Sequence, residues 1–236
     1  VARPMQKLLK ASGVSFAIMQ EERCHGEFAR RMGEEYLFQT AAQENLDNFA
    51  QYSFKRILTA CPHCFNTLAR EYPAFEGFNY SVISHTVWLN EMIQSGKLPR
   101  PSATLGSTAY HDPCYLARMN GIVDAPRNVL KSVSGDLRLP AETGTRTFCC
   151  GAGGGQMWSE GNVAKTVNVI RLKDLRATGA SQVAVACPHC LTMLESAKSL
   201  DKSASETAIK DVAELVLEAL ESQSLLNDKT EEVAHG

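Results

Sequence analysis

Short apolar runs alternate with longer amphipathic stretches from one end of the chain to the other. The spacing of apolar positions predicts a helix over residues 3–11, a short buried strand over 14–19 and a long helix from Glu27 to about Gln51. Five residues of the long helix are expected to face inward: Phe28, Met32, Tyr36, Ala41 and Leu46. Strands that alternate with helices are typical of α/β proteins with mostly parallel sheets.

The rest of the first half predicts two further pairs of a strand and a helix. A strand over residues 57–60 is followed by a helix over 63–71. A short strand near Ile83 then precedes a helix that runs through Met92. The glycine and prolines of residues 96–101 are typical of a linker.

The second half of the chain repeats motifs of the first. Each half contains the tetrapeptide Cys-Pro-His-Cys, which follows an apolar strand and opens a helix. The two copies begin at Cys61 and Cys187, a shift of 126 residues. The same shift, to within one residue, aligns two upstream motifs, Cys24-His25-Gly26 and Cys149-Cys150-Gly151. Repetition at this length indicates two similar domains.

We therefore predict two tandem α/β cysteine-rich domains at residues 1–98 and 99–225, followed by a flexible tail at 226–236. In parallel α/β sheets, ligands bind beyond the carboxyl ends of the strands. Both Cys-Pro-His-Cys motifs lie at such ends, and so does the segment from His111 to Cys114, after a predicted strand at 107–110. The cysteines are thus expected at the C-terminal strand ends.

Composition and charge narrow the class of protein. The 236 residues are 44% hydrophobic and 21% charged, which is typical of a globular chain with a core. A formal net charge of −2 gives no reason to expect nucleic acid as a partner. No run approaches the ~20 apolar residues of a transmembrane helix, and no signal peptide is visible. We expect a cytoplasmic chain that, starting at Val1 rather than Met, is the C-terminal part of a longer protein.

Eight cysteines are the most informative feature of the composition. Disulfide frameworks belong to small secreted chains with thin cores, whereas this chain is long and carries no secretory signal. Thiolates that bind a metal in a reducing compartment fit better. Five cysteines fall in the second half: Cys114, Cys149, Cys150, Cys187 and Cys190. Three fall in the first half: Cys24, Cys61 and Cys64.

The doublet Cys149-Cys150 runs into a glycine-rich turn at residues 151–155. Glycine lets the backbone approach a bulky group closely, so that N–H groups of this turn can bond to the sulfurs of a cluster. A cubane cluster of four irons takes four thiolates, and the second half offers five. The fifth thiolate would be a spare, a bridge between irons or a catalytic thiol.

Two motifs of the second half resemble those of a known family. The stretch from Cys149 to Trp158 and the stretch from His111 to Arg118 are similar to the CCG cysteine-rich domain of heterodisulfide reductase, in its B and D subunits. The same domain occurs in the iron–sulfur subunits of glycerol-3-phosphate dehydrogenase and of lactate utilisation. The resemblance implies an iron–sulfur oxidoreductase with a [4Fe–4S] cluster on the five cysteines of the second half, in some members a non-cubane cluster.

The resemblance also implies partners. An electron-donor domain or subunit is expected, which would be ferredoxin-type, a flavoprotein or quinone-linked. An upstream domain or a membrane-anchored partner would place the chain on the cytoplasmic face of a membrane. Whether the chain has its own active site or only relays electrons stays open at this point.

The first half departs from the family pattern because its doublet is Cys24-His25, with one thiol fewer. Cys24, Cys61 and Cys64 leave one ligand position open, which His25, water or a cysteine upstream of Val1 would fill. An iron–sulfur cluster or a zinc ion could occupy such a site. A zinc-stabilised interaction module with a Cys₃His site is therefore one alternative function. A thioredoxin-like disulfide exchanger is another, because Cys-Pro-His-Cys at a helix start activates a thiol.

The remaining histidines, tryptophans and arginines are given simpler roles. His111 either positions a cluster sulfur or relays a proton, or it caps a strand end. The histidines of the two Cys-Pro-His-Cys motifs either tune the thiolates or point to solvent. Trp88 and Trp158 are expected to be packing residues. Ordinary solvated helix positions are expected for four residues: Arg30, Arg31, Arg171 and Lys173.

Overall fold

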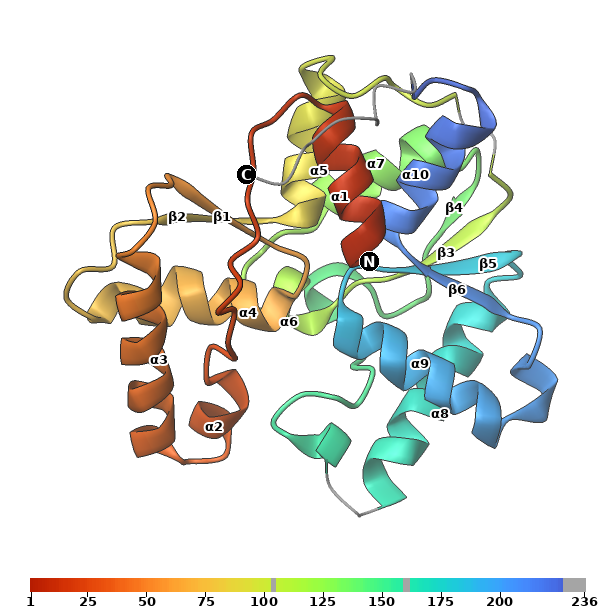
Figure 1. Ribbon diagram of the computed structural model, residues 1–236. Coiled ribbons are helices and arrows are strands. Elements are labelled where there is room, and N and C mark those ends of the chain that lie inside the picture. The colour runs from red at the N-terminus through yellow and green to blue at the C-terminus, as the bar shows by residue number, and fades with distance from the viewer. Residues whose placement is uncertain (103–104, 159–161, 227–236) are drawn as a thin grey trace.

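The computed structural model describes residues 1–102, 105–158 and 162–226, and Figure 1 shows two parallel sheets joined by helices. The smaller sheet pairs β1 (Arg56–Thr59) with β2 (Ser81–Ser84). The larger sheet has the strand order β4 (Leu137–Arg138), β3 (Thr108–His111), β5 (Gln182–Val185), β6 (Ala208–Asp211). Every strand pairing within the described residues is parallel, which confirms the predicted α/β class.

Helices cover both faces of the four-stranded sheet, as parallel strands require. One face carries four helices, namely α1 (Ala2–Ala11), α5 (His85–Gln94), α7 (Asp124–Val133) and α10 (Val212–Ser222) (Figure 1). The opposite face carries α8 (Asn162–Ala177) and α9 (Pro188–Leu200). The carboxyl ends of the central strands β3 and β5 therefore open at one edge, between these two layers.

The first half forms a smaller unit beside the large sheet. Its helices are α2 (Glu27–Arg31), α3 (Glu35–Phe49) and α4 (Pro62–Asn66). A π-helical segment over Thr67–Glu71 continues α4. Helix α4 lies against the short helix α6 (Cys114–Ala117) of the second half, near the middle of the molecule (Figure 1). The carboxyl ends of both sheets consequently lie near the same boundary.

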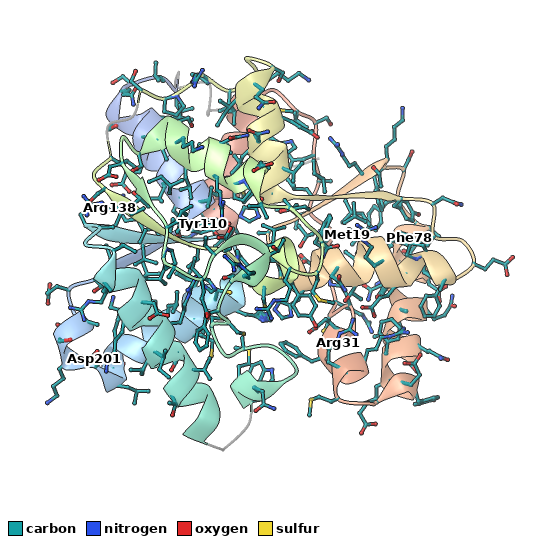
Figure 2. The ribbon with its side chains drawn as sticks, turned by 180° about the vertical axis from the view of Figure 1, so that it is seen from behind. Met19, Arg31, Phe78, Tyr110, Arg138 and Asp201 are labelled. Atoms are coloured by element: carbon teal, nitrogen blue, oxygen red, sulfur yellow. The ribbon has the colours of Figure 1, made fainter. Side chains whose placement is uncertain are left out.

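The main hydrophobic core crosses from the first half into the second. Leu8 and Trp88 of the first half share it with Tyr110, Leu130 and Val212 of the second. Tyr110 is fully buried, and Figure 2 places it in the interior of the molecule. Apolar side chains from both sides of residue 98 thus pack in one core. The division into two domains at that residue stays a prediction.

The order of elements repeats as the cysteine motifs do. Strand β1, helix α4, strand β2 and helix α5 follow one another in the first half, and β5, α9, β6 and α10 do so in the second. Gly26 and Gly151, the glycines of the two aligned upstream motifs, both adopt left-handed backbone conformations, with φ of 76° and 94°. The similarity therefore extends from sequence spacing to backbone geometry.

The predicted strand over residues 14–19 is wrong. This segment has no strand partner among the described residues, and its side chains point to different surroundings. Val14 packs against the main core and Met19 against the core of the first half, while Ile18 is 68% exposed. An apolar run of this length serves as a connection that contacts two cores in turn.

The predicted continuous helix from Glu27 to Gln51 is also wrong. Gly33, with a φ of 90°, ends α2 and changes the direction of the chain before α3. The break alters which positions face inward, so that Met32 and Tyr36 of the predicted stripe are exposed. The buried apolar residues of α3 are Phe38, Ala42, Leu46 and Phe49.

The two tryptophans pack in different surroundings. Trp88 is buried in the core, as predicted. Trp158 is 67% exposed and packs at the surface, edge-on against the ring of Phe28, with the two centroids 6.2 Å apart. Most of the predicted tail, from residue 227 on, lies outside the described residues.

Candidate metal centre

Cys187 and Cys190 stand at the carboxyl end of a central strand. Strand β5 ends at Val185, and Cys187 is the N-cap of α9 with Pro188 in the first helical position. Proline suits that position because its fixed φ matches the helix and its missing N–H would have no helical partner. Both thiols are buried. Cys61 holds the equivalent N-cap position between β1 and α4.

The glycine-rich turn aims backbone N–H groups at the cysteine doublet. Gly151 donates its N–H to Cys149 Sγ at 3.2 Å, and the N–H groups of Gly153 and Ala152 bond to Cys149 and Cys150, respectively. Hydrogen bonds from neighbouring thiols, and then from this backbone, lower the pKa of Cys149. The turn therefore stabilises negative charge on the sulfurs of the doublet, whereas bonds from the turn to the sulfurs of a cluster stay a prediction.

The five thiols of the second half form one connected group. Cys114 and Cys150 donate hydrogen bonds to Cys149. Cys190 lies within hydrogen-bonding reach of both Cys150 and Cys187. Burial adds to these bonds in raising the pKa of Cys190, because a thiolate is costly away from water. Three segments far apart in the sequence thus deliver their sulfurs to one place.

The thiols of the first half join the same group. Cys61 accepts hydrogen bonds from Cys187 and from Cys64, which lower the pKa of Cys61 to about 2. Cys24 is exposed and lies close enough to Cys64 to act on it electrostatically. The two predicted ligand sets therefore meet at the contact between Cys61 and Cys187.

His111 lies at the end of β3 and belongs to the sulfur group. Its Nε2 atom is 3.3 Å from Cys190 Sγ, and Nε2 lies with the sulfurs of Cys150 and Cys190 in a set whose members are within 4.8 Å of one another. Burial, and then the charge of Arg171, lower the pKa of His111 to about 3. The imidazole is therefore neutral.

The donor set fits an iron–sulfur cluster better than a hard cation. All eight cysteines are free, and the site is lined by sulfur, one imidazole and backbone N–H groups. Soft thiolates are the ligands of iron–sulfur clusters, whose bound sulfurs accept hydrogen bonds from backbone N–H groups. Five connected thiols exceed what one tetrahedral zinc ion takes. Around Cys61, the donor set of three thiols and the nearby His25 would suit either an iron–sulfur cluster or a zinc ion.

The histidines of the two Cys-Pro-His-Cys motifs stack on each other across the boundary between the halves. The rings of His63 and His189 are 4.9 Å apart, and Tyr115 stacks on the other side of His63 at 4.0 Å. His63 Nδ1 lies 3.2 Å from Oε1 of the buried Glu27. His63 therefore does not point to solvent, which was one of its two predicted roles.

Asp112 is a site residue that sequence reasoning assigned no role. It is fully buried, and its Oδ2 atom accepts hydrogen bonds from Arg127, from Thr143 and from the N–H of Gly144 at 2.6–2.9 Å. Thr147 closes the arrangement by donating its hydroxyl to the backbone carbonyl of Asp112 at 2.9 Å. These bonds tie the segment before the doublet to the strand end that carries Cys114. The close spacing of Asp112 and Cys114 was the available signal.

The predicted solvated position of Arg171 is wrong. Its side chain is fully buried, with Nε donating to His111 Nδ1 at 3.0 Å. Arg171 falls in helical phase with Asn168, Leu172 and Leu175, which are also buried, and this phase was the signal in the sequence. Arg30 and Arg31 are partly exposed and form ion pairs with glutamates. Lys173 is exposed, as predicted.

His85, for which the sequence indicated no partner, has one. Its Nε2 atom lies 3.3 Å from Asp211 Oδ1, and both side chains are fully buried. Asp211 is also the N-cap of α10 and forms a capping box with Glu214. This contact joins the ends of β2 and β6, the last strands of the two repeats.

Comparison with known proteins places the chain in a family. The model of the cysteine-rich domain called CCG matches residues 1–69 and 108–195, two segments that together contain all eight cysteines. The chain belongs to the CCG cysteine-rich domain family. The predicted resemblance is thereby confirmed, and each half of the chain contributes one matched segment.

Curated relatives include several iron–sulfur proteins and oxidoreductases. An "EtfAB:quinone oxidoreductase" of Syntrophomonas wolfei is 40% identical over 94% of this chain and 32% of the relative. A "Probable membrane-anchored ferredoxin" of Chromohalobacter salexigens is 39% identical over 93% of this chain and 33% of the relative. One of the subunits of the dihydromethanophenazine:CoB–CoM heterodisulfide reductase of Methanosarcina barkeri is 32% identical over 91% of this chain and 54% of the relative.

The chain spans about a third of the length of the first two relatives and about half of the third. None of the helices in the described ranges combines the length and the apolar character that crossing a bilayer needs.

Proposed function

We propose that the chain is the cluster-bearing part of an iron–sulfur oxidoreductase and passes electrons through two adjacent [4Fe–4S] clusters. The observation that carries the proposal is the contact between Cys61 and Cys187, where the two predicted ligand sets meet. Family membership and the names of the iron–sulfur relatives support the cofactor class.

The second half would hold one cluster through five thiolates: Cys114, Cys149, Cys150, Cys187 and Cys190. Such a cluster supplies one-electron redox chemistry. The chain's own contribution is a group of neighbouring thiols with backbone N–H groups at Cys149, which stabilise the negative charge of the ligands. A fifth thiolate allows a ligand bridge or a non-cubane arrangement.

The first half would hold the other cluster through Cys24, Cys61 and Cys64. The fourth ligand would be His25, water or a cysteine of a longer chain. Cys61 acts on His25 electrostatically, and burial lowers the pKa of His25. A neutral imidazole of this kind is a competent ligand.

Electrons would enter at one cluster and leave from the other. Each transfer takes one electron from a reduced donor to an oxidised cluster, and no thiol of the chain changes its bonding. The names of two relatives favour a ferredoxin-type partner, a quinone-linked acceptor and a membrane anchor. The donor would be ferredoxin-type or a flavoprotein, and a further domain or partner would hold the chain on the cytoplasmic face of a membrane. Because Cys61 and Cys187 are in contact, the distance for electron transfer between the two clusters would be short.

Anaerobic purification followed by iron, zinc and sulfide analysis tests this function. About eight irons and eight sulfides per chain are expected, because each of two clusters contains four of each. Zinc with iron near zero would replace this proposal with a zinc-stabilised module. About four irons with one zinc would restrict it to the second half.

A reductase with its own active site is a sharper form of the same function. It predicts that a disulfide substrate changes the EPR spectrum of the reduced clusters. An electron relay predicts a spectrum that stays the same when disulfides and thiols are added. The burial of Cys150, Cys187 and Cys190 favours the relay, because these sulfurs are out of reach of a dissolved disulfide.

A further inference from the structure

Arg171 is a buried cation whose hydrogen-bond partners among the described residues are all uncharged. Besides His111 Nδ1, its guanidinium donates to the backbone carbonyl of Glu142 at 3.1 Å and to the hydroxyl of Thr147 at 3.4 Å. Asp174, Asp112 and Glu142 act on it electrostatically, but none of them forms an ion pair with it among the described residues. Burial of a charge without a directly paired carboxylate is costly, so that this position calls for a specific role. Arg171 reaches the sulfur group through His111.

The contact between Arg171 and His111 determines which ring nitrogen of the histidine carries the proton. A guanidinium has donors and no acceptor. His111 Nδ1 lies 3.0 Å from Arg171 Nε and must therefore accept, which leaves the proton of the neutral ring on Nε2. Nε2 is the atom that lies 3.3 Å from Cys190 Sγ. The N–H of His111 consequently points at a sulfur.

The same contact excludes a second role for His111. Its Nε2 atom, Cys150 Sγ and Cys190 Sγ lie within 4.8 Å of one another, a spacing that would suit three ligands of one metal ion. A metal on Nε2 needs the lone pair of that nitrogen, and the ring proton must then move to Nδ1. There it would face the N–H of Arg171, and two donors would oppose each other.

We propose that Arg171 is a positioning residue that holds His111 in its Nε2–H tautomer, so that His111 donates a hydrogen bond to Cys190 and does not ligate the metal. This inference rests on the proposed function, because it concerns a cluster bound at Cys190. A hydrogen bond to a ligand sulfur withdraws electron density and raises the reduction potential of a cluster. The pair Arg171–His111 would thus raise the reduction potential of the second cluster.

Four variants separate the donor role from the ligand role. His111→Leu removes the donor, whereas His111→Gln keeps an N–H that can reach the sulfur. Arg171→Met removes the group that fixes the tautomer, whereas Arg171→Lys keeps a donor to Nδ1. Arg176→Met serves as the matched control, because Arg176 lies on the same helix and bonds to Ser203 away from the sulfurs.

Redox titration of the iron-loaded full chain, followed by EPR, is the first measurement. We expect a lower potential of one cluster in His111→Leu and in Arg171→Met, and no further shift when the two changes are combined. His111→Gln, Arg171→Lys and Arg176→Met should stay near the unaltered chain. Equal potentials in His111→Leu, His111→Gln and the unaltered chain would overturn the proposal. If Arg171→Met does not fold, the two His111 variants still decide.

Pulsed EPR of reduced chain labelled with ¹⁵N-histidine is the second measurement. A hydrogen-bonded imidazole gives a weak nitrogen coupling that disappears in His111→Gln. A strong coupling of a directly bound nitrogen that disappears in the same variant would make His111 a ligand and overturn the inference. Iron analysis of each sample distinguishes a failure of the proposed function from a failure of this inference. Absence of iron contradicts the proposed function, whereas an iron-loaded chain in which His111 ligates the cluster contradicts only this inference.

Discussion

The two halves of the chain present the same Cys-Pro-His-Cys motif in different surroundings. In the second half, Cys187 and Cys190 are buried, begin a helix of 13 residues and are joined by three further thiols. In the first half, Cys61 and Cys64 are partly exposed and begin a helix of 5 residues. The motif alone therefore places two cysteines at the start of a helix, and the neighbouring segments determine which metal group these cysteines can bind.

The polar groups that support the two sites differ as well. The strand end of the second site carries Asp112, whose carboxylate accepts one hydrogen bond from Arg127 and two from the segment before the doublet. The first site is supported by the buried Glu27, which lies against His63. The two sites therefore share the spacing of their cysteines but differ in the buried polar residues that hold those cysteines in place. The following substitutions test that difference.

The largest effect is expected from the cysteine at the contact between the sites. Cys187→Ser should lower the iron content by about half or more, because it removes a ligand of the second cluster and disturbs Cys61 of the first. Cys24→Ser should spare the second cluster, since Cys24 is exposed and lies at the edge of the group. Iron analysis with circular dichroism as a folding control checks both. Equal losses in the two variants would break the comparison.

A second large effect concerns Asp112. Asp112→Ala leaves the partly exposed Arg127 without its carboxylate, removes two further buried hydrogen bonds and should lower the free energy of unfolding by about 3 kcal/mol. Asp136→Ala is the matched control, because Asp136 forms a surface ion pair with Arg138 whose loss should cost about 0–1 kcal/mol. Anaerobic urea titration measures both. A cost for Asp112→Ala as small as that of the control would show that this carboxylate does not support the site.

Glu27 should give the first site a dependence on pH. Burial opposes its ionisation, but His63, Tyr115 and Arg31 together lower the pKa of Glu27 below its ordinary value. The charged carboxylate therefore stabilises the fold above its unfolded-state pKa, and this contribution is lost as the pH falls through the lower, folded-state pKa. Glu27→Gln should flatten the fall in unfolding free energy between about pH 5 and pH 3. The same slope in both proteins would contradict this role.

The smallest effect concerns the turn glycine of the first site. Gly26→Ala and Gly33→Ala both place a side chain in the left-handed region, at a cost of about 1–2 kcal/mol each. Gly26→Ala should cost more, because its Cβ would lie 3.0 Å from the ring of Phe38, while the Cβ at Gly33 meets nothing within 4 Å. Thermal melting of the two variants measures the difference. Equal melting temperatures would remove the packing role of Gly26, the counterpart of Gly151.

Much of this arrangement could be predicted because it depends on local sequence. A strand that stops at Cys61 or Cys187 and a proline that opens the next helix are short-range signals, and the repeat doubles them. The glycines after Cys149 indicate a close backbone approach for the same reason. These signals were enough to place sulfurs at strand ends and to indicate the family.

The missed features depend on contacts between distant segments. Arg171 resembles a surface residue of an amphipathic helix, and only the packing of α8 against β3 turns it towards His111. Likewise, the proximity of Cys61 to Cys187 depends on how the two halves meet. The break at Gly33 was visible as a glycine, but a glycine within a helical pattern does not by itself end the helix.

The EPR spectrum of the fully reduced, iron-loaded chain tests the central claim most directly, because two adjacent paramagnetic clusters interact magnetically. The account predicts a spectrum broadened or split by spin coupling, which simplifies to that of a single cluster in Cys24→Ser. Two sharp, independent signals that add without interaction would contradict the adjacency on which the proposed electron path depends.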